Sequence, residues 1–262
     1  SPLHIRARAV SRRARPSNPP VHSVFMSDPS TLDTLRAEID RLDTVIHDAL
    51  MARTQVVARV AQAKRRDSGA LGTGLRPDRE AAIARRLSQR HTGAFPEASL
   101  QRIWREIVCV MTQIQVPFSA HLGGRDALLR DAARFAFGSG TDLVTHETAS
   151  RALIAAGERE SDIAVLPVGE DAGEAEPWWL AVPERAAVLM RAGTALVIGP
   201  RLDLEWDVPV AVVTPDCDAL PVLDTAPDGR RLVAGDVASL PSACIIRPLG
   251  GYMDGPWLAP PI

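Results

Sequence analysis

Cysteine is scarce in this sequence of 262 residues, and the positions of its few cysteines exclude the usual cysteine chemistries. Cys109, Cys217 and Cys244 lie far apart, form no CxxC pair and have no histidine at a spacing suited to zinc. Such thiols are typical of proteins kept in a reducing compartment. We therefore expect three reduced, structural thiols, no metal site and a cytoplasmic protein.

Long apolar runs and aromatic clusters are also absent. No run reaches the length of a membrane span or resembles the core of a signal peptide, so we predict no membrane partner. Aromatic residues make up 4% of the chain and no basic patch is interleaved with them, which argues against nucleic acid as a partner. Residues 27–116 carry a net charge of +3, which suits a small anionic ligand, and the following residues carry −10.

Lysine is the rarest charged residue, because 29 of the 30 cationic side chains are arginine and the remaining one is Lys64. A single Lys among so many Arg indicates a position that needs a compact ammonium, although compositional drift gives the same pattern. Lys64 follows Arg53 by eleven residues, close to three helical turns, so the two cations share one helix face. Two cations on a packed face either pair with carboxylates of a neighbouring helix or hold a bound anion.

Residues 31–66 carry one uninterrupted helical pattern with the spacing of a coiled-coil seam. The seam consists of Leu32, Leu35, Ile39, Leu42, Ile46, Ala49, Val56, Val60 and Ala63, with Arg53 in a seam position. A monomer of three helices would leave half of this long seam exposed to water. We therefore expect a homodimer that pairs the long helices and brings Arg36 of one chain near Arg53 and Lys64 of the other.

Two shorter helices follow in the predicted all-α part. The first runs over residues 77–91, with Pro77 at its first position and acidic residues in its first turn. The second runs over residues 97–115, and its next stripe position after Met111 is the polar Gln115. The predicted apolar stripe of this helix consists of Leu100, Ile103, Trp104, Ile107, Val108 and Met111.

Residues 117–262 change character and alternate short apolar runs with helical stretches. We predict strands at 119–124, 142–147 and 162–169, helices at 127–137 and 149–156, and further strands near 195–198 and 208–213. Strand–helix–strand spacing of this kind predicts a mostly parallel sheet. The predicted fold class is α + α/β, with a disordered Arg-rich leader at 1–26, a helical domain at 27–116 and a small α/β domain at 117–262.

The helical part resembles the all-helical chorismate mutases. The resemblance rests on LRAEIDRLD at 35–43, AQAK ending at Lys64, RPDRE at 76–80 and a last helix that ends in Gln115. The resemblance covers residues 30–116. No single motif is specific to this family, but the whole set of motifs in this order is. The implied activity is the rearrangement of chorismate to prephenate, which needs no nucleophile, metal or cofactor, and the sequence offers none.

The resemblance also implies roles for individual residues. Arg36 from the partner subunit and Arg53 each hold a carboxylate of the substrate. Lys64 and Gln115 flank the ether oxygen of chorismate. Glu80 accepts a hydrogen bond from the ring hydroxyl.

Arg79 is implied to help shape the site, and two neighbouring positions depart from the family pattern. An Asp of that pattern is Arg76 here, and a Ser one turn before the terminal Gln is Met111. These departures imply altered affinity. They also leave open an alternative, a weak or inactive dimeric module that binds chorismate-like or prephenate-like dicarboxylates for regulation.

The order of elements after residue 117 is similar to the opening of prephenate dehydratase catalytic domains, including the strand DIAVLPV followed by the acidic Glu170. The Thr-Arg-Phe motif of active dehydratases is absent, and its nearest candidate is IIRPLGGY. The resemblance implies a degenerate lobe with a structural or ligand-sensing role. A bifunctional mutase–dehydratase is a third possible function, beside the mutase and the regulatory module. The large aromatic residues Trp178, Trp179, Tyr252 and Trp257 are expected to pack in the core.

Overall fold

The computed structural model describes residues 29–68, 73–169, 177–217 and 219–254. The predicted disordered leader, Glu170 and Trp257 lie outside the described residues. The chain divides into two units, residues 1–51 and residues 52–262. The predicted domain borders at residues 26 and 116 stay predictions.

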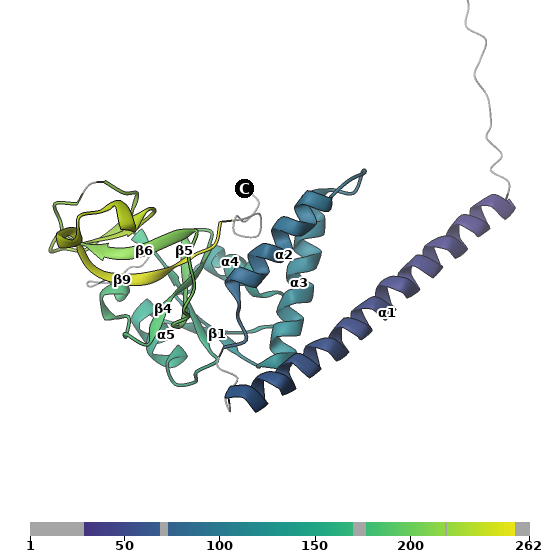
Figure 1. The fold of residues 1–262 in the computed structure, drawn as a ribbon, viewed down its shortest axis with the longest axis horizontal. Coiled ribbons are helices and arrows are strands. Elements are labelled where there is room, and N and C mark those ends of the chain that lie inside the picture. Colours follow the sequence, from purple (N-terminus) through teal and green to yellow (C-terminus); the bar gives the residue numbers. More distant parts are fainter. Residues whose placement is uncertain (1–28, 69–72, 170–176, 218, 255–262) are drawn as a thin grey trace, which may run out of the picture. The chain divides into compact units, whose positions relative to one another are not determined.

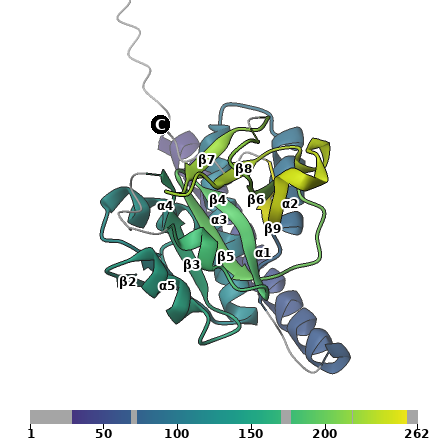
Figure 2. The same cartoon turned by 90° about the vertical axis from the view of Figure 1, so that its left-hand side faces the viewer.

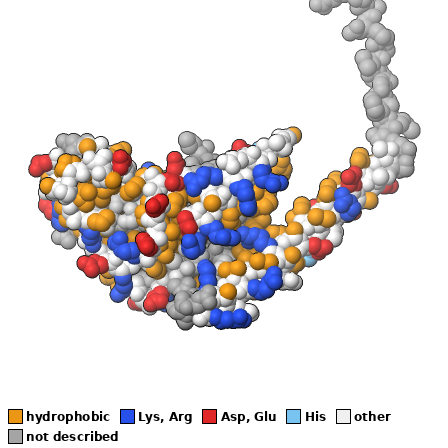
Figure 3. All heavy atoms as spheres, viewed as in Figure 1, with side chains coloured by type: hydrophobic (Ala, Val, Ile, Leu, Met, Phe, Trp, Pro, Cys, Tyr) orange, Lys and Arg blue, Asp and Glu red, His pale blue; other side chains and the backbone are white. Residues whose placement is uncertain are grey.

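Helix α1 (Pro29–Ser68) is 40 residues long and confirms the predicted long helix. It contains no Pro after its first residue and no Gly, so nothing in its sequence interrupts the hydrogen-bond ladder. In the first unit most of its described apolar side chains are exposed. Leu35, Ile39 and Ile46 are each more than half accessible to solvent, and Figure 3 shows hydrophobic side chains along this helix.

Helices α2 (Pro77–Arg90) and α3 (Glu97–Gln115) also agree with the prediction. Pro77 starts α2 with a fixed φ, and Asp78 and Glu80 lie in its first turn, where the helix dipole favours carboxylates. Pro96 precedes α3 and Pro117 follows its cap residue, Val116, which limits the helix at both ends. The two helices pack against each other (Figure 1).

The predicted buried stripe of α3 is only partly right. Ile103 is 47% exposed, whereas Gln101, Arg105 and Thr112 are buried. These three polar residues repeat four and seven residues apart and so form a second stripe along the helix. The helix therefore buries a partly polar face.

The described residues of the α/β region form one sheet of nine strands in the order β2-β1-β3-β5-β4-β9-β6-β8-β7 (Figure 2). The strands are β1 (Ser119–Gly123), β2 (Asp142–His146), β3 (Ile163–Pro167), β4 (Ala186–Ala192), β5 (Ala195–Pro200), β6 (Val208–Val213), β7 (Val222–Thr225), β8 (Arg231–Ala234) and β9 (Ile245–Tyr252). The fold class α + α/β is confirmed.

Parallel pairing is concentrated in the first three strands, where it was predicted. β1 pairs in parallel with both β2 and β3, and the connections are the helices α4 (Ala127–Phe137) and α5 (Ala149–Ala156). Beyond β3 the sheet is mixed rather than mostly parallel: β3/β5, β4/β5, β6/β8, β6/β9 and β7/β8 are antiparallel, while β4/β9 is parallel.

Short connections explain antiparallel pairing, as β4 and β5 show. Only Gly193 and Thr194 separate β4 from β5, and Gly193 has a φ of 58°. A two-residue turn of this kind joins antiparallel strands, whereas a parallel pair needs a crossover of about a dozen residues or more. The sequence between β3 and β6 therefore builds a hairpin.

The sheet is covered on both faces. Ile163 and Val165 of β3 belong to the core that contains α4, and the alternating Ala164 and Leu166 belong to the core that contains α5. Figure 1 shows α4 on the side of the sheet that carries α2 and α3, and α5 on the opposite side. Helix α3 contacts α4, and α4 contacts the sheet, so α4 connects the helical part of the second unit to the sheet.

Candidate functional site

A cavity of about 290 Å³ lies in the second unit between the C-terminal part of α1 and the helices α2 and α3. Its apolar lining includes Val56, Val57, Val60, Ile83, Val108 and Met111, and its polar and charged lining consists of Arg53, Lys64, Arg76, Arg79, Glu80, Thr112 and Gln115. The described lining contains no Cys, Ser, His or Asp. A side chain suited to covalent or acid–base catalysis is thus limited here to Glu80, Lys64 and the Thr112 hydroxyl.

Five of the six predicted site residues line this cavity. They are Arg53, Lys64, Arg79, Glu80 and Gln115. The sixth, Arg36, belongs to the first unit, where its exposed guanidinium lies 3.3 Å from the carboxylate of Asp33. The roles assigned to all six stay predictions.

The charge of the cavity is strongly positive. Among the described residues, four cations line it, and the single lining carboxylate is Glu80. Figure 3 shows Lys and Arg side chains gathered over the helical part of the molecule around α2. Arg76 is partly neutralised by Asp78, because its Nε and Nη2 atoms donate to the two carboxylate oxygens at 3.1 and 2.9 Å. The cavity therefore suits a ligand with more than one negative charge.

Crowding of cations shifts the titration of two of them. Burial, followed by repulsion from Arg76 and Arg79, holds the pKa of Lys64 below the usual range of lysine. Burial and repulsion from Arg79 lower the pKa of Arg53 in the same way. A bound anion would reverse these shifts by favouring both charged forms.

Arg53 carries an unsatisfied donor. Its Nη1 atom is buried and has no hydrogen-bond partner among the described residues. A buried donor without a partner costs free energy that a ligand oxygen would recover. Arg53 is therefore the side chain whose own geometry calls most directly for an anionic ligand.

Glu80 is buried and held from two directions. Arg105 Nη1 donates to its Oε2 at 2.7 Å, and the backbone N–H of Arg76 donates to its Oε1 at 3.4 Å. Arg105 was missed in the sequence, because its acceptors lie 25, 31 and 85 residues away along the chain. The available signal was a cation on the polar stripe of α3.

Gln115 closes the cavity at the end of α3. Its Nε2 atom donates to the carbonyl of Met111 at 3.2 Å, so the amide folds back onto its own helix. Thr54 Oγ1 donates to Met111 Sδ at 3.5 Å and ties α1 to the same turn of α3. Among the described residues, a ligand acceptor has to compete with this one longer hydrogen bond for the Gln115 amide.

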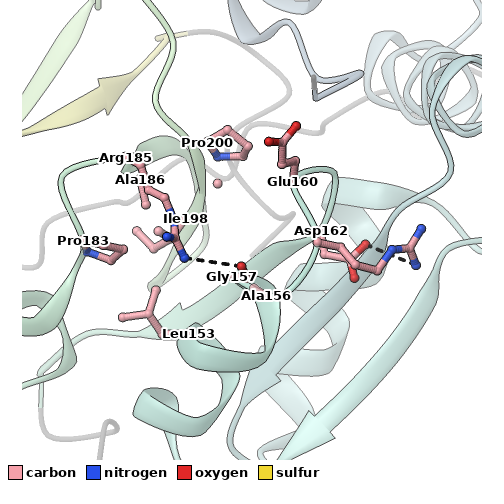
Figure 4. A pocket seen from close by; sticks show the side chains of 12 residues that line it. Leu153, Ala156, Gly157, Glu160, Asp162, Pro183, Arg185, Ala186, Ile198 and Pro200 are labelled. Carbon is pink, nitrogen blue, oxygen red and sulfur yellow. Dashed lines mark hydrogen bonds and ion pairs between the residues drawn. The ribbon is translucent and has the colours of Figure 1, made fainter. Parts of the chain in front are cut away.

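A second cavity, of about 240 Å³, lies in the α/β region where α5 ends (Figure 4). Three of its charged groups contact protein atoms: Arg185 Nη2 donates to the carbonyl of Gly157 at 3.4 Å, and Arg159 lies 3.7 Å from Asp162. Asp162 also lies 3.3 Å from Nε2 of His121. None of the predicted site residues lines this cavity, and we assign it no ligand.

The segment nearest to a dehydratase motif has a structural role. Arg247, in IIRPLGGY, donates from Nη1 to the carbonyl of Val182 at 2.5 Å and from Nη2 to the carbonyl of Trp179 at 3.0 Å. Trp178 and Trp179 are fully buried, which confirms that they pack in the core, and Tyr252 is buried as well. Arg247 thus anchors the short helix Trp178–Ala181 to β9.

Other predicted features concern the whole described chain. The three cysteines are free, as predicted, and burial raises the pKa of the Cys109 thiol to about 12. No described helix combines the length and the apolar character that a membrane crossing requires. The described residues also contain no cluster of three metal-binding side chains.

Residues 35–116 match the family described as chorismate mutase type II. The chain is 29% identical over 145 residues to a bifunctional chorismate mutase/prephenate dehydratase of Neisseria gonorrhoeae, an alignment that covers 53% of this chain and 38% of the relative. It is 29% identical over 120 residues to the protein with the same description from Pseudomonas aeruginosa, which covers 44% of this chain and 32% of the relative. The chain thus spans about a third of the length of these curated relatives.

These comparisons confirm the resemblance of the helical part to chorismate mutases. The match with the Neisseria protein is longer than the whole segment before β1, so it includes part of the α/β region. A relative whose description includes prephenate dehydratase is consistent with a dehydratase-like region after the helices.

Proposed function

We propose that residues 27–116, most of which match the chorismate mutase type II family, form a chorismate mutase of aromatic amino-acid biosynthesis. The enzyme would be an isomerase that rearranges chorismate to prephenate. The observation that carries the proposal is the cavity in which Arg53, Lys64, Arg79, Glu80 and Gln115 meet. Its excess of cations fits the two carboxylates of chorismate.

Arg53 supports binding and orientation of the substrate. Chorismate reacts by an intramolecular rearrangement, in which one C–O bond breaks while a C–C bond forms and no proton is transferred. An enzyme accelerates such a reaction by holding the compact, reactive conformer of the substrate. Arg53 can clamp one carboxylate with its planar guanidinium, and this contact would satisfy the buried Nη1 atom.

Lys64 supplies the charge that the transition state needs. The ether oxygen gains negative charge as its C–O bond breaks, so an ammonium beside it stabilises the transition state more than the ground state. We assign this position to Lys64 and the second donor to Gln115, whose amide lies at the same cavity. Glu80 would accept the hydrogen bond of the ring hydroxyl, and Arg79 would complete the positive wall.

The active form would be a homodimer in which Arg36 reaches the cavity of the partner subunit. The exposed Leu35, Ile39, Leu42 and Ile46 support this proposal, since a row of large apolar side chains on a soluble helix is usually covered by a partner. Pairing two long helices would bury this row and follow the two-fold symmetry of most homodimers. A cytoplasmic location stays a prediction.

The direct test is conversion of chorismate by the purified chain and by its Lys64→Ala variant. We expect prephenate from the wild type and a loss on the order of 10²–10³-fold in kcat for Lys64→Ala. Lys64 is only half-buried, so the variant should keep its fold in a thermal melt. Arg86→Ala removes an exposed cation of α2 that does not line the cavity and serves as the control.

Two other functions give different results in the same assay. A regulatory module would bind chorismate saturably and form no prephenate, which would contradict the proposal. Dehydratase activity would form phenylpyruvate from added prephenate. We expect none, because Arg247 of the nearest motif is engaged with backbone carbonyls of the Trp178–Ala181 helix and its flank.

A further inference from the structure

Arg105 is a deeply buried cation that the proposed mechanism does not use. Its side chain is 4% exposed, and that of its partner Glu80 is 8% exposed. The pair joins the middle of α3 to the first turn of α2 through the 2.7 Å contact between Nη1 and Oε2. Glu80 lines the cavity, whereas Arg105 does not. Arg105 therefore contacts a cavity residue without lining the cavity itself.

The rest of the Arg105 guanidinium contacts the α/β region. Nε donates to the carbonyl of Ala136, in the last turn of α4, at 2.6 Å. Nη2 lies 3.1 Å from the sulfur of Met190 in β4. One planar group therefore links a cavity carboxylate to a helix and a strand of the sheet domain.

Other contacts near Arg105 also join α3 to the C-terminal end of α4 and the residues that follow it. Cys109 Sγ lies 3.3 Å from the same Ala136 carbonyl, and Glu106 accepts hydrogen bonds from the backbone N–H of Ser139 at 3.0 and 3.1 Å. Gly138 has a φ of 75°, and a Cβ added there would lie 2.8 Å from the Glu106 carboxylate. The C-terminal end of α4 is thus fitted closely to the face of α3 that carries Arg105.

From these contacts we propose that Arg105 is a positioning residue for the mutase reaction, which fixes the Glu80 carboxylate in the cavity and ties its position to α4 and β4. The proposal rests on the proposed function. A carboxylate buried without its cation would either protonate or turn toward the cationic wall of the cavity. In both cases Glu80 would no longer present an acceptor to the ring hydroxyl in a fixed direction. The α/β region would then support catalysis without touching the substrate.

The test is a double-mutant cycle on kcat/KM for chorismate with Glu80→Gln, Arg105→Met and the double variant of the full chain. We expect each single variant to lose on the order of 10²-fold, as for a misplaced catalytic contact. The double variant should equal Glu80→Gln, because Arg105 acts only through Glu80. Arg102→Met, an exposed cation of the same helix, should leave kcat/KM unchanged.

The division of the loss between kcat and KM adds a readout that a purely structural role would not reproduce. In Arg105→Met this division should match that of Glu80→Gln, because both changes remove the same fixed acceptor. The double variant should show the same division. A loss in Arg105→Met that appears only as lower thermal stability would contradict the proposal.

Arg105→Met leaves a buried charge unpaired and could prevent folding. Two further variants keep the proposal testable in that case. The double variant removes both charges and should fold, so its kcat/KM can still be compared with that of Glu80→Gln. Arg105→Lys keeps the charge but cannot contact Glu80, Ala136 and Met190 with one planar group, and it should lose part of the activity.

The link to β4 is tested by Met190→Leu, which keeps the volume of the side chain and removes the sulfur. We expect kcat/KM to fall severalfold, and to be unaffected by the same change in a Glu80→Gln background. Met253→Leu changes another buried methionine of the α/β region and should have no effect.

Three outcomes would contradict three different claims: the role of Arg105, the contribution of β4 and the proposed function. A double variant far less active than Glu80→Gln would overturn the proposal for Arg105. Equal activity of Met190→Leu and wild type would remove β4 from it. A wild-type chain that forms no prephenate would instead overturn the proposed function, and the inference that rests on it would fall as well.

Discussion

At the scale of single residues, the most informative detail is that Lys64 lies close to other cationic side chains. Its pKa is lowered by burial and by the cations Arg76 and Arg79. The protonated ammonium is the form that can stabilise a developing oxyanion. We therefore expect kcat/KM for chorismate to fall as the pH rises through the lowered pKa of Lys64.

Replacing Arg76 by Gln should move that alkaline fall to higher pH. The change removes a positive charge that lowers the pKa of Lys64, and it frees Asp78, whose negative charge acts in the same direction. Initial rates of chorismate loss across the alkaline range would measure the shift. Arg86→Gln is the control, and a fall that stays in place or moves to lower pH in Arg76→Gln would show that another group sets it.

At the scale of secondary-structure elements, close packing between β1 and α5 positions the first three strands. A Cβ on Gly123, at the end of β1, would lie 2.5 Å from the Cα of Ala149 in α5. Backbone at this distance cannot give way as a flexible side chain can. Glycine at this position therefore sets how closely α5 approaches the sheet.

Gly123→Ala should lower the free energy of unfolding by about 1–3 kcal/mol, the usual cost of overpacking. Gly140→Ala is a matched control, because a Cβ at Gly140 meets no atom within 4 Å and its φ is not in the left-handed region. Urea unfolding of both variants would give the comparison. An equal stability of the two variants would mean that α5 shifts away without cost.

The elements that could be predicted are those with local signals. The α2 helix begins at Pro77 and α3 is bounded by Pro96 and Pro117, so their limits could be predicted from residues inside the segment. By contrast, β9 contains Pro248 and two consecutive glycines, and β7 has only four residues. Their strand character depends on pairing with distant partners, and it could not be recognised from their own composition.

The site residues also divide into those that a local sequence pattern indicates and those that depend on distant contacts. The eleven-residue spacing of Arg53 and Lys64 predicts a shared helix face, and both side chains line one cavity. Arg79, Glu80 and Gln115 were proposed from the family resemblance and line it too. The link from Glu80 through Arg105 to Ala136 and Met190 joins four elements, so no local pattern indicates it.

At the scale of the whole molecule, the proposed active site needs residues from two chains. The row of exposed apolar residues on α1 is unexplained in a single chain, and Arg36 in the first unit pairs only with the exposed Asp33 among the described residues. A homodimer assigns both a function, since the apolar row would form the interface and Arg36 would complete the partner's cavity.

Subunit complementation tests this central claim most directly. Arg36→Ala and Lys64→Ala homodimers should each be nearly inactive on chorismate. After they are mixed, unfolded and refolded together, each heterodimer should contain one intact site built from Arg36 of one subunit and Lys64 of the other. Statistical pairing then predicts recovery of about one quarter of wild-type activity. Mixed samples that stay as inactive as their separate components would contradict a site shared between two subunits.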